Sequence, residues 1–259
     1  MNPADAAIVV ADLRKSYGDV EAVKGISFSV RRGTTTALLG GNGAGKTTTL
    51  SMLLGVLTPT AGRVTVLGAE MPAQRHRVLP RLNFTSPYVD LPKRLTVREN
   101  LAVVADLYGV RNARERIDAV AADCDLALLL KRPYGNLSAG QRTRVSLAKA
   151  IINEPEVLLL DEPTASLDPD IGDRMRSYLE RYQHRTGCTM LLASHHMGEV
   201  ERMCDDVIML REGKVVDQGS PQQLLARYGR ENMEEVFLDV ARGRPDERVP
   251  GGAAVETAA

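Results

Sequence analysis

Near the start of the chain, apolar and polar residues alternate with the period of two that is typical of a β-strand with one buried face. Ile26, Phe28 and Val30 alternate with serines in GISFSV, and Val64 and Val66 flank a threonine in RVTVLG. The run TTTALL between these segments is predicted to be a further strand. We therefore expect roughly the first 70 residues to form a small antiparallel sheet wrapped around that run.

Between residues 92 and 155 the apolar spacing changes to that of amphipathic helices. Three segments carry this pattern: LTVRENLAVVADLYGV, ARERIDAVAADCDLALLL and SAGQRTRVSLAKAIIN. Pro133 and Gly135 interrupt the chain before the third segment, as residues between helices commonly do. The stretch is predicted to be a helical lobe inserted into the sheet-forming part of the chain.

Short continuous apolar runs return after residue 155, and such runs are typical of strands that are buried on both faces. EVLLLDEP and CTMLLASH are two of them, and a helix of about a dozen residues is predicted between them, near residues 173–185. Strand, helix and strand in succession indicate a right-handed parallel crossover. The segment DVIMLREGKVVDQG is predicted to be a hairpin that turns at Glu212 and Gly213.

Composition narrows the class of protein. The 259 residues, 44% of them hydrophobic, suffice for one large α/β domain with an inserted lobe or for two small domains. Because 33 basic residues balance 33 acidic ones, net charge gives no global attraction to nucleic acid or anionic lipid. Three widely spaced cysteines argue against a disulfide framework or zinc site and favour a reducing cytoplasm. The sequence shows neither a signal-peptide pattern nor an apolar window of about 18 residues.

A glycine-rich stretch follows the run TTTALL. Gly40, Gly45, Lys46 and Thr47 match G-x-x-x-x-G-K-[ST], in which glycines let backbone N–H groups approach a polyanion and the next helix adds its positive dipole end. Lys46 is predicted to bind β- and γ-phosphates, and the Thr47 hydroxyl to bind Mg²⁺. The alternative, a glycine-rich turn that matches by chance, is disfavoured by the strand before it and the helix after it. The predicted nucleotide-binding loop is Gly40, Gly41, Asn42, Gly43, Ala44, Gly45, Lys46, Thr47 and Thr48.

Two acidic residues, Asp161 and Glu162, end the apolar run VLLL. Central parallel strands end at the ligand crevice of an α/β sheet. Asp161 is therefore predicted to bind Mg²⁺ through water, and Glu162 to accept a proton from an attacking water. The alternative is a strand that ends in a solvated acidic turn, and the presence of Lys46 upstream argues against it.

His195 follows the run TMLLAS and is expected at the same sheet edge as Asp161. From there it could donate a hydrogen bond to a γ-phosphate and stabilise developing charge. A histidine at a strand end more often faces solvent or caps a helix. The neighbouring His196 competes for the same role, although it can equally begin the next helix.

These elements, in this order, resemble the nucleotide-binding subunits of ATP-binding cassette (ABC) transporters over residues 6–240. LSAGQ, residues 137–141, is similar to the family signature LSGGQ and is the most specific element. Ser138 stands where a helix N-cap is expected, which would give the chain a second helix N-terminus suited to anions. The resemblance implies that Ser138, Gly140 and Gln141 contact ATP; without it, Ser138 would be read simply as an N-cap.

The resemblance also implies a homodimer that binds two ATP molecules with Mg²⁺. In the family, two subunits pack head to tail, and each signature contacts the ATP held by the other subunit's phosphate loop. Asp168 in SLDP matches the loop that reaches across that interface. Tyr17 matches the aromatic residue that stacks on adenine, a contact with little selectivity for the base. A strand-edge tyrosine is the alternative interpretation of Tyr17.

Three positions depart from the family pattern. Gly41 replaces a commoner proline, and Ala139 replaces the first glycine of the signature; neither is expected to prevent ATP binding. The family glutamine that touches Mg²⁺ and senses the membrane partner falls near Thr85 or Ser86, whose side chains are shorter. Ser86 is kept as a candidate metal-site residue that acts through water. This departure bears on the coupling of hydrolysis to transport rather than on ATP binding.

The resemblance implies an α/β fold: a P-loop NTPase (RecA-like) core with an N-terminal antiparallel β subdomain and an inserted α-helical subdomain. The core would comprise residues 6–91 and 156–225, and the helical subdomain residues 92–155. Residues 226–240 would form a C-terminal segment. Residues 241–259, rich in Pro, Gly and Ala, are predicted to be a disordered tail.

The implied function is ATP hydrolysis at the cytoplasmic face of a membrane, driving transport through separate permease subunits, with no nucleic-acid partner. The ending NMEEVFLDVA resembles subunits that serve exporters, which favours export over import. A soluble ABC-type ATPase that remodels a protein or nucleic-acid complex is the alternative, but such proteins usually carry two cassettes or long coiled-coil insertions. A P-loop kinase would not need LSAGQ, and a GTPase would need the absent N-K-x-D motif. The transported compound is not specified by this chain.

Overall fold

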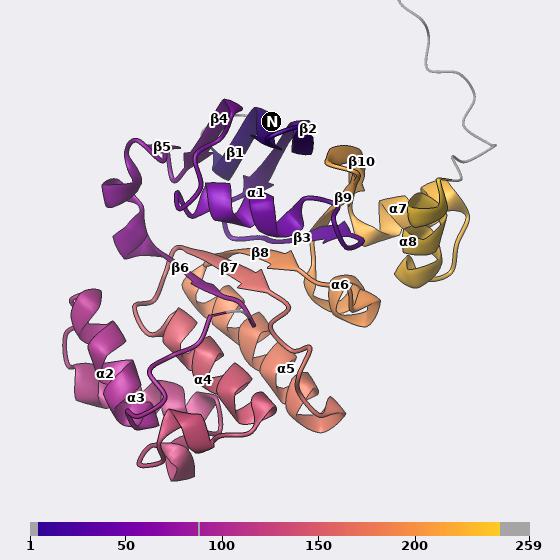
Figure 1. Ribbon diagram of the computed structural model, residues 1–259. Coiled ribbons are helices and arrows are strands. Elements are labelled where there is room, and N and C mark those ends of the chain that lie inside the picture. Colours follow the sequence, from indigo (N-terminus) through magenta and orange to yellow (C-terminus); the bar gives the residue numbers. More distant parts are fainter. Residues whose placement is uncertain (1–4, 88, 244–259) are drawn as a thin grey trace, which may run out of the picture.

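The computed structural model describes residues 5–87 and 89–243 of the chain (Figure 1). Within these residues two sheets form, as the alternating and continuous apolar patterns indicate. The first is a four-stranded antiparallel sheet in the order β2-β1-β4-β5. Its strands are β1 (Ala6–Tyr17), β2 (Val20–Arg31), β4 (Ala61–Val66) and β5 (Ala69–Met71).

The second sheet has six strands in the order β10-β9-β3-β8-β7-β6. Neighbouring strands from β9 to β6 are parallel, and β10 pairs antiparallel with β9 in the expected hairpin. Every residue of β3, β7 and β8 is buried, as continuous apolar runs predict. The strands are β3 (Thr35–Gly40), β6 (Leu82–Thr85), β7 (Val157–Asp161), β8 (Thr189–Ala193), β9 (Asp206–Arg211) and β10 (Lys214–Gly219).

The expectation that the antiparallel sheet wraps around TTTALL is wrong. These residues form β3, which lies between β8 and β9 in the parallel sheet. Helix α1 (Lys46–Leu53) packs between the two sheets, as Figure 1 shows. Because β3 is buried on both faces, it needs strand neighbours on both edges and helices or sheet on both faces, which the antiparallel sheet alone could not supply.

Side chains of the parallel strands alternate between two hydrophobic cores. Leu159 and Leu191 point into the core shared with α1 and the antiparallel sheet. Leu158, Leu160 and Leu192 point into a larger core on the opposite face, built with the helices. Figure 1 shows α4 (Ala139–Ile151) and α5 (Pro169–Thr186) on that face.

The helical lobe contains α2 (Val97–Leu107), α3 (Ala113–Asp123) and α4, the three helices expected between residues 92 and 155. The helix after β7 is longer than expected, since α5 has 18 residues rather than about a dozen. It begins at Pro169, which suits the first helical position, and ends at Thr186, after which Gly187 adopts the left-handed conformation. The last helices are α6 (Met197–Met203), α7 (Pro221–Tyr228) and α8 (Met233–Arg242).

Helix α8 continues through Arg242, into the start of the segment 241–259 that was expected to be disordered. Residues 244–259 of that segment lie outside the described residues. No helix among the described residues has the length and apolar character needed to cross a bilayer.

Candidate functional site

The carboxyl ends of three parallel strands, β3, β7 and β8, bring most of the predicted site residues to one edge of the sheet. The glycine-rich loop follows β3, Asp161 ends β7, and His195 follows β8. The strand register aligns these ends, because Asp161 pairs with Ala193 and Leu38 pairs with the same alanine. Residues from distant parts of the sequence therefore meet where α/β sheets commonly bind ligands.

The loop between β3 and α1 depends on glycine at particular positions. Gly43 and Gly45 have φ values of 78° and 101°, which side chains with a Cβ atom rarely adopt. A Cβ atom on Gly40 would lie 2.6 Å from the carbonyl oxygen of Leu210 and 2.7 Å from the Cβ of Ala44. The loop thus curls tightly against β9 and leaves its backbone accessible on the other side.

Lys46 lies over this loop at the start of α1. Its Nζ donates hydrogen bonds to the carbonyl oxygens of Gly40 and Gly41, at 2.5 and 3.2 Å. Burial lowers the pKa of Lys46, while the negative charges of Glu162 and Asp161 act in the opposite direction. The ammonium group is therefore held among loop carbonyls and carboxylates, next to N–H groups at the beginning of a helix.

An open cavity of about 520 Å³ borders the loop. Its lining comprises the loop residues 41–48 together with Val20, Glu21, Ala22, Lys24 and Glu212. Tyr17, at the end of β1, pairs with Val20 and is 51% exposed. The Nζ of Lys15 lies 5.2 Å from the centre of the Tyr17 ring. Tyr17 thus stands beside the cavity with an accessible ring, although it does not belong to the lining.

Asp161 and Glu162 differ in their surroundings although they are adjacent. Asp161 is 7% exposed, and burial raises the pKa of its carboxyl, while a hydrogen bond from the Ser86 hydroxyl at 3.2 Å acts to lower it. Glu162 has a φ of 50°, and its N–H donates to the Ala193 carbonyl at 2.8 Å. Positive φ is uncommon for glutamate, and such strained residues cluster at functional sites.

Glu162 and His195 are in direct contact. The Oε1 of Glu162 lies 2.6 Å from the Nδ1 of His195, whose side chain is 64% exposed. The neighbouring His196 instead serves as the N-cap residue of α6. The structure therefore separates the two histidines, and it is His195 that pairs with the acidic residue.

The donors near Asp161 suit Mg²⁺. Magnesium prefers oxygen ligands and usually retains water and substrate phosphates among them. Thr47 is the second residue of α1, Asp161 ends β7, and Ser86 hydrogen-bonds to Asp161, so each would offer an oxygen. No three His, Cys, Asp or Glu side chains gather around one point in the described part of the chain. A Mg²⁺ ion here would therefore take most of its ligands from hydroxyls, water and a nucleotide.

The signature segment lies apart from this cavity. Ser138 is the N-cap of α4, as expected, and forms a capping box with Gln141. A Cβ atom on Gly140 would lie 3.1 Å from the carbonyl oxygen of Ser166, so the start of α4 packs against the loop that leads to Asp168. Among the described residues that line the cavity at the phosphate loop, none belongs to the signature or to SLDP.

Sequence reasoning did not single out several residues around the site. Val20 and Glu212 line the cavity, although neither belongs to a motif. Glu199, on α6, contacts residues beside Glu162 and His195. Glu199 lies four residues after His195, in the first turn of α6. Side chains in a helix point toward its N-terminus, so this spacing could have predicted that Glu199 lies near the His195 loop.

Comparison with known proteins gives a consistent result. The family model described as "ABC transporter" matches residues 23–165. The chain is 39% identical over 236 residues to the Nod factor export ATP-binding protein I of Ralstonia nicotianae, covering 89% of this chain and 72% of that protein. It is 37% identical over 249 residues to the protein of the same name from a Rhizobium species, covering 94% of this chain and 79% of that protein.

Solved structures resemble the fold closely. An ATP-binding subunit of an ABC transporter superposes with a TM-score of 0.84 at 25% identity, covering 90% of this chain and 99% of that one. The cbiO1 protein of Clostridium perfringens, part of the cbiONQ ABC transporter complex, gives a TM-score of 0.75 at 29% identity, covering 93% and 96%. A dimeric bacterial ABC transporter cassette, with a TM-score of 0.77 at 23% identity over 82% and 98%, shares the fold.

Proposed function

The chain belongs to the ABC transporter family of ATP-binding proteins, and from this premise we propose that it is the ATP-hydrolysing subunit of an exporter, which acts as a homodimer on separate permease subunits. The observation that carries the proposal is the contact of 2.6 Å between Glu162 and His195, at the sheet edge that also presents Lys46. A base (Glu162), a hydrogen-bond donor (His195) and a cation (Lys46) thus lie at the same edge of the sheet.

These three side chains can divide the work of phosphoryl transfer. Lys46 and the N–H groups of the loop would bind the β- and γ-phosphates and hold them in position. Glu162 would orient a water molecule and accept its proton, because it follows β7 at the sheet edge where its charge acts on Lys46. His195, whose Nδ1 faces Glu162, would in its doubly protonated form donate a hydrogen bond from Nε2 to the γ-phosphate as negative charge develops on it.

A bound Mg²⁺ ion would neutralise part of the phosphate charge. We assign its protein contacts to Thr47 and Asp161, with Ser86 acting through water. Tyr17, with a half-exposed ring beside the cavity, is the candidate for stacking on adenine. These assignments follow from the donor types and from their place around the loop.

A second copy of the chain would complete each site. Ser138, Gly140 and Gln141 stand at a helix start that is not part of the lining of the phosphate-loop cavity in their own chain, and Asp168 is exposed in the segment beside them. The signature residues would then contact the ATP that is bound at the phosphate loop of the other copy. This explains why they do not line the cavity of their own chain. The dimeric cassettes among proteins of the same fold support this arrangement.

The transport role and its direction rest on the relatives. Proteins named Nod factor export ATP-binding protein I cover most of this chain at 37–39% identity. We therefore propose export, with the chain bound peripherally at the cytoplasmic face beneath its permease. No nucleic-acid partner is proposed.

The decisive test of the hydrolytic site is Glu162→Gln. This variant keeps the shape of the side chain but removes the base, so we expect it to bind ATP, accumulate as a dimer and lose turnover by about 100-fold or more. ATP binding, gel filtration with ATP and phosphate release measure these properties. Glu115→Gln, at an exposed position in α3, is the matched control and should behave as wild type. Undiminished hydrolysis by Glu162→Gln would refute the assignment of the base.

The membrane partnership has a separate test. Affinity purification of the chain from gently solubilised native membranes should recover a polytopic membrane protein in stoichiometric amount. Recovery of only soluble proteins or nucleic acid would contradict the transport role and favour a soluble remodelling ATPase.

A further inference from the structure

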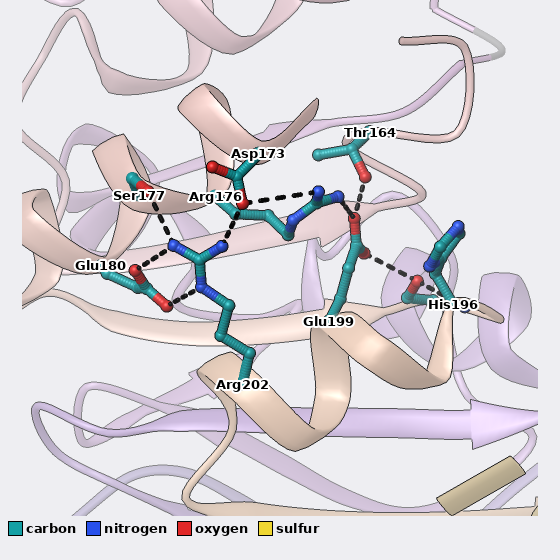
Figure 2. Close-up of polar contacts among 9 residues, drawn as sticks. Thr164, Asp173, Arg176, Ser177, Glu180, His196, Glu199 and Arg202 are labelled. Atoms are coloured by element: carbon teal, nitrogen blue, oxygen red, sulfur yellow. Dashed lines mark hydrogen bonds and ion pairs between the residues drawn. The ribbon is translucent and has the colours of Figure 1, made fainter. Parts of the chain in front are cut away.

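Glu199 is a buried carboxylate at the centre of a polar network between α5 and α6, and Figure 2 shows its position. The residue is 2% exposed. A buried carboxylate is costly unless it is hydrogen-bonded and its charge is compensated. The partners of this group therefore indicate what it holds in place.

Each oxygen of Glu199 binds a different loop. Oε1 accepts a hydrogen bond from the Thr164 hydroxyl, in the loop after β7. Oε2 accepts a hydrogen bond from the Ser194 hydroxyl at 3.0 Å, in the loop after β8. The Ser194 oxygen in turn accepts the N–H of His196 at 3.0 Å, which fixes the turn that contains His195.

These two loops carry the contact pair of the site. Thr164 follows Glu162 by two residues, and Ser194 directly precedes His195. The single carboxylate of Glu199 thus ties together the two backbone segments from which Glu162 and His195 reach each other at 2.6 Å. Neither Thr164 nor Ser194 is exposed, so water does not compete freely for these bonds.

Charged side chains on the neighbouring helices hold Glu199 in position. Arg176, on α5, brings its Nη1 to 3.4 Å from Oε1 and compensates the buried charge. Arg202, on α6, binds Asp173 at 2.5 Å and Glu180 at 2.8 Å, and both carboxylates belong to α5. Arg176 and Arg202 therefore link the two helices next to Glu199, as the dashed contacts in Figure 2 show.

We propose that Glu199 is a positioning residue for ATP hydrolysis, which acts by holding the loops after β7 and β8 so that His195 and Glu162 stay in contact. This inference rests on the proposed function. Its consequence is specific: losing the carboxylate should impair the chemical step and leave nucleotide binding intact, because Glu199 touches neither the phosphate loop nor Lys46. Misplacement of catalytic groups by about 1 Å is known to cost up to roughly 100-fold in rate.

The test is Glu199→Gln, which keeps the size of the side chain, removes its charge and replaces one of the two accepting oxygens by an NH2 donor. We expect kcat to fall on the order of tenfold with KM and ATP affinity unchanged. Glu180→Gln is the matched control, because this carboxylate lies in the same network but contacts neither loop; its kcat should stay within about twofold of wild type. Ser194→Ala removes the tie to the β8 loop and the hydrogen bond from the His196 N–H but keeps the bond from Thr164, so it should give a partial loss of kcat.

A double-mutant cycle separates positioning from a general loss of structure. If Glu199 acts through His195, then adding Glu199→Gln to His195→Ala should lower kcat by less than about twofold. An equal tenfold loss in both backgrounds would overturn the proposal, as would a raised KM with normal kcat. Should Glu199→Gln fail to fold, Ser194→Ala carries the same test in the His195→Ala background.

The outcomes distinguish this inference from the proposed function. If Glu162→Gln abolishes turnover while Glu199→Gln hydrolyses ATP like wild type, only the positioning role is wrong. If the wild-type chain itself does not hydrolyse ATP, or Glu162→Gln remains fully active, the proposed function fails first.

Discussion

Two helices of this chain, α1 and α4, begin in ways that suit anions, yet their first turns differ. Helix α1 follows Gly45, which has no side chain to occupy the first N–H groups. Helix α4 follows Ser138, whose Oγ accepts the N–H of Gln141 at 3.2 Å while the Gln141 side chain accepts the N–H of Ser138 at 3.0 Å. One helix start is open, and the other is closed by its own capping box.

The difference indicates that the two helix starts have different roles. The α1 start combines open N–H groups, a curled glycine loop and the ammonium of Lys46, so it can hold a polyphosphate within one chain. At α4 the Ser138 oxygen is engaged as an acceptor, but its O–H can still donate one hydrogen bond. We therefore expect α1 to determine affinity for ATP and α4 to contribute after a second copy has approached.

The largest effect on ATP binding should come from Lys46→Ala. Removal of the ammonium deletes a charged hydrogen bond to the phosphates, worth about 2–3 kcal/mol, so ATP affinity should fall on the order of 100-fold. Titration with a fluorescent ATP analogue measures it. Lys214→Ala, at an exposed position on β10, is the control and should bind normally. An unchanged Kd for Lys46→Ala would remove the basis for treating α1 as the affinity site.

Ser138→Ala should affect turnover instead of binding. Loss of one hydrogen bond to the γ-phosphate predicts hydrolysis lower by roughly tenfold, with the ATP affinity of the monomer unchanged. The variant also loses its helix cap, at a cost of about 1 kcal/mol. Ser220→Ala controls for this cost, because Ser220 and Gln223 form the same capping box on α7. Equal turnover losses in the two variants would mean that Ser138 contributes only as a helix cap and not through contact with ATP.

A mixing experiment sharpens the comparison between the two helices. In a mixed dimer of Lys46→Ala and Ser138→Ala copies, one composite site has both its lysine and its serine. We expect the mixture to hydrolyse ATP several-fold faster than either variant alone, as complementation between partner copies requires. Activity equal to the mean of the two separate variants would show that Ser138 serves its own chain.

The sequence predicted the local parts of this site better than their surroundings. The loop at Gly40–Thr47 could be predicted because positive φ and close approach demand glycine, and the N-cap at Ser138 because capping has a short sequence signature. The place of TTTALL in the parallel sheet was missed, since an apolar run does not reveal its strand neighbours. Glu199 was missed because its spacing from His195 was the only local signal, whereas its partners come from two loops that the fold brings together.

The smallest expected effect concerns a second lysine, Lys149, which lies in the last turn of α4 and contrasts with Lys46 on α1. Lys149 is 8% exposed, donates to the Phe84 carbonyl at 2.7 Å and lies 4.5 Å from the centre of the Phe84 ring. Burial lowers its pKa to about 8 from an ordinary value of 10.5. Lys46 faces carboxylates that favour its charge, whereas Lys149 lies against the carbonyl and the ring of Phe84.

This difference predicts a pH dependence of stability. Below its folded pKa of about 8, Lys149 is charged in both states, and burial of that charge weakens the fold. Between that value and 10.5 the unfolded chain binds more protons than the folded chain, so stability rises with pH. Relative to Lys149→Met, the free energy of unfolding of the wild type should increase by about 2 kcal/mol from pH 7 to pH 9.5.

Urea denaturation of both proteins at the two pH values gives this difference, and subtraction of the variant cancels the titration of all other groups. A wild-type minus variant difference that does not change with pH would mean that Lys149 keeps its ordinary affinity for the proton. In that case the carbonyl and ring of Phe84 would fully offset the effect of burial on the pKa of Lys149. The two lysines would then differ in their place in the fold but not in how burial affects their protonation.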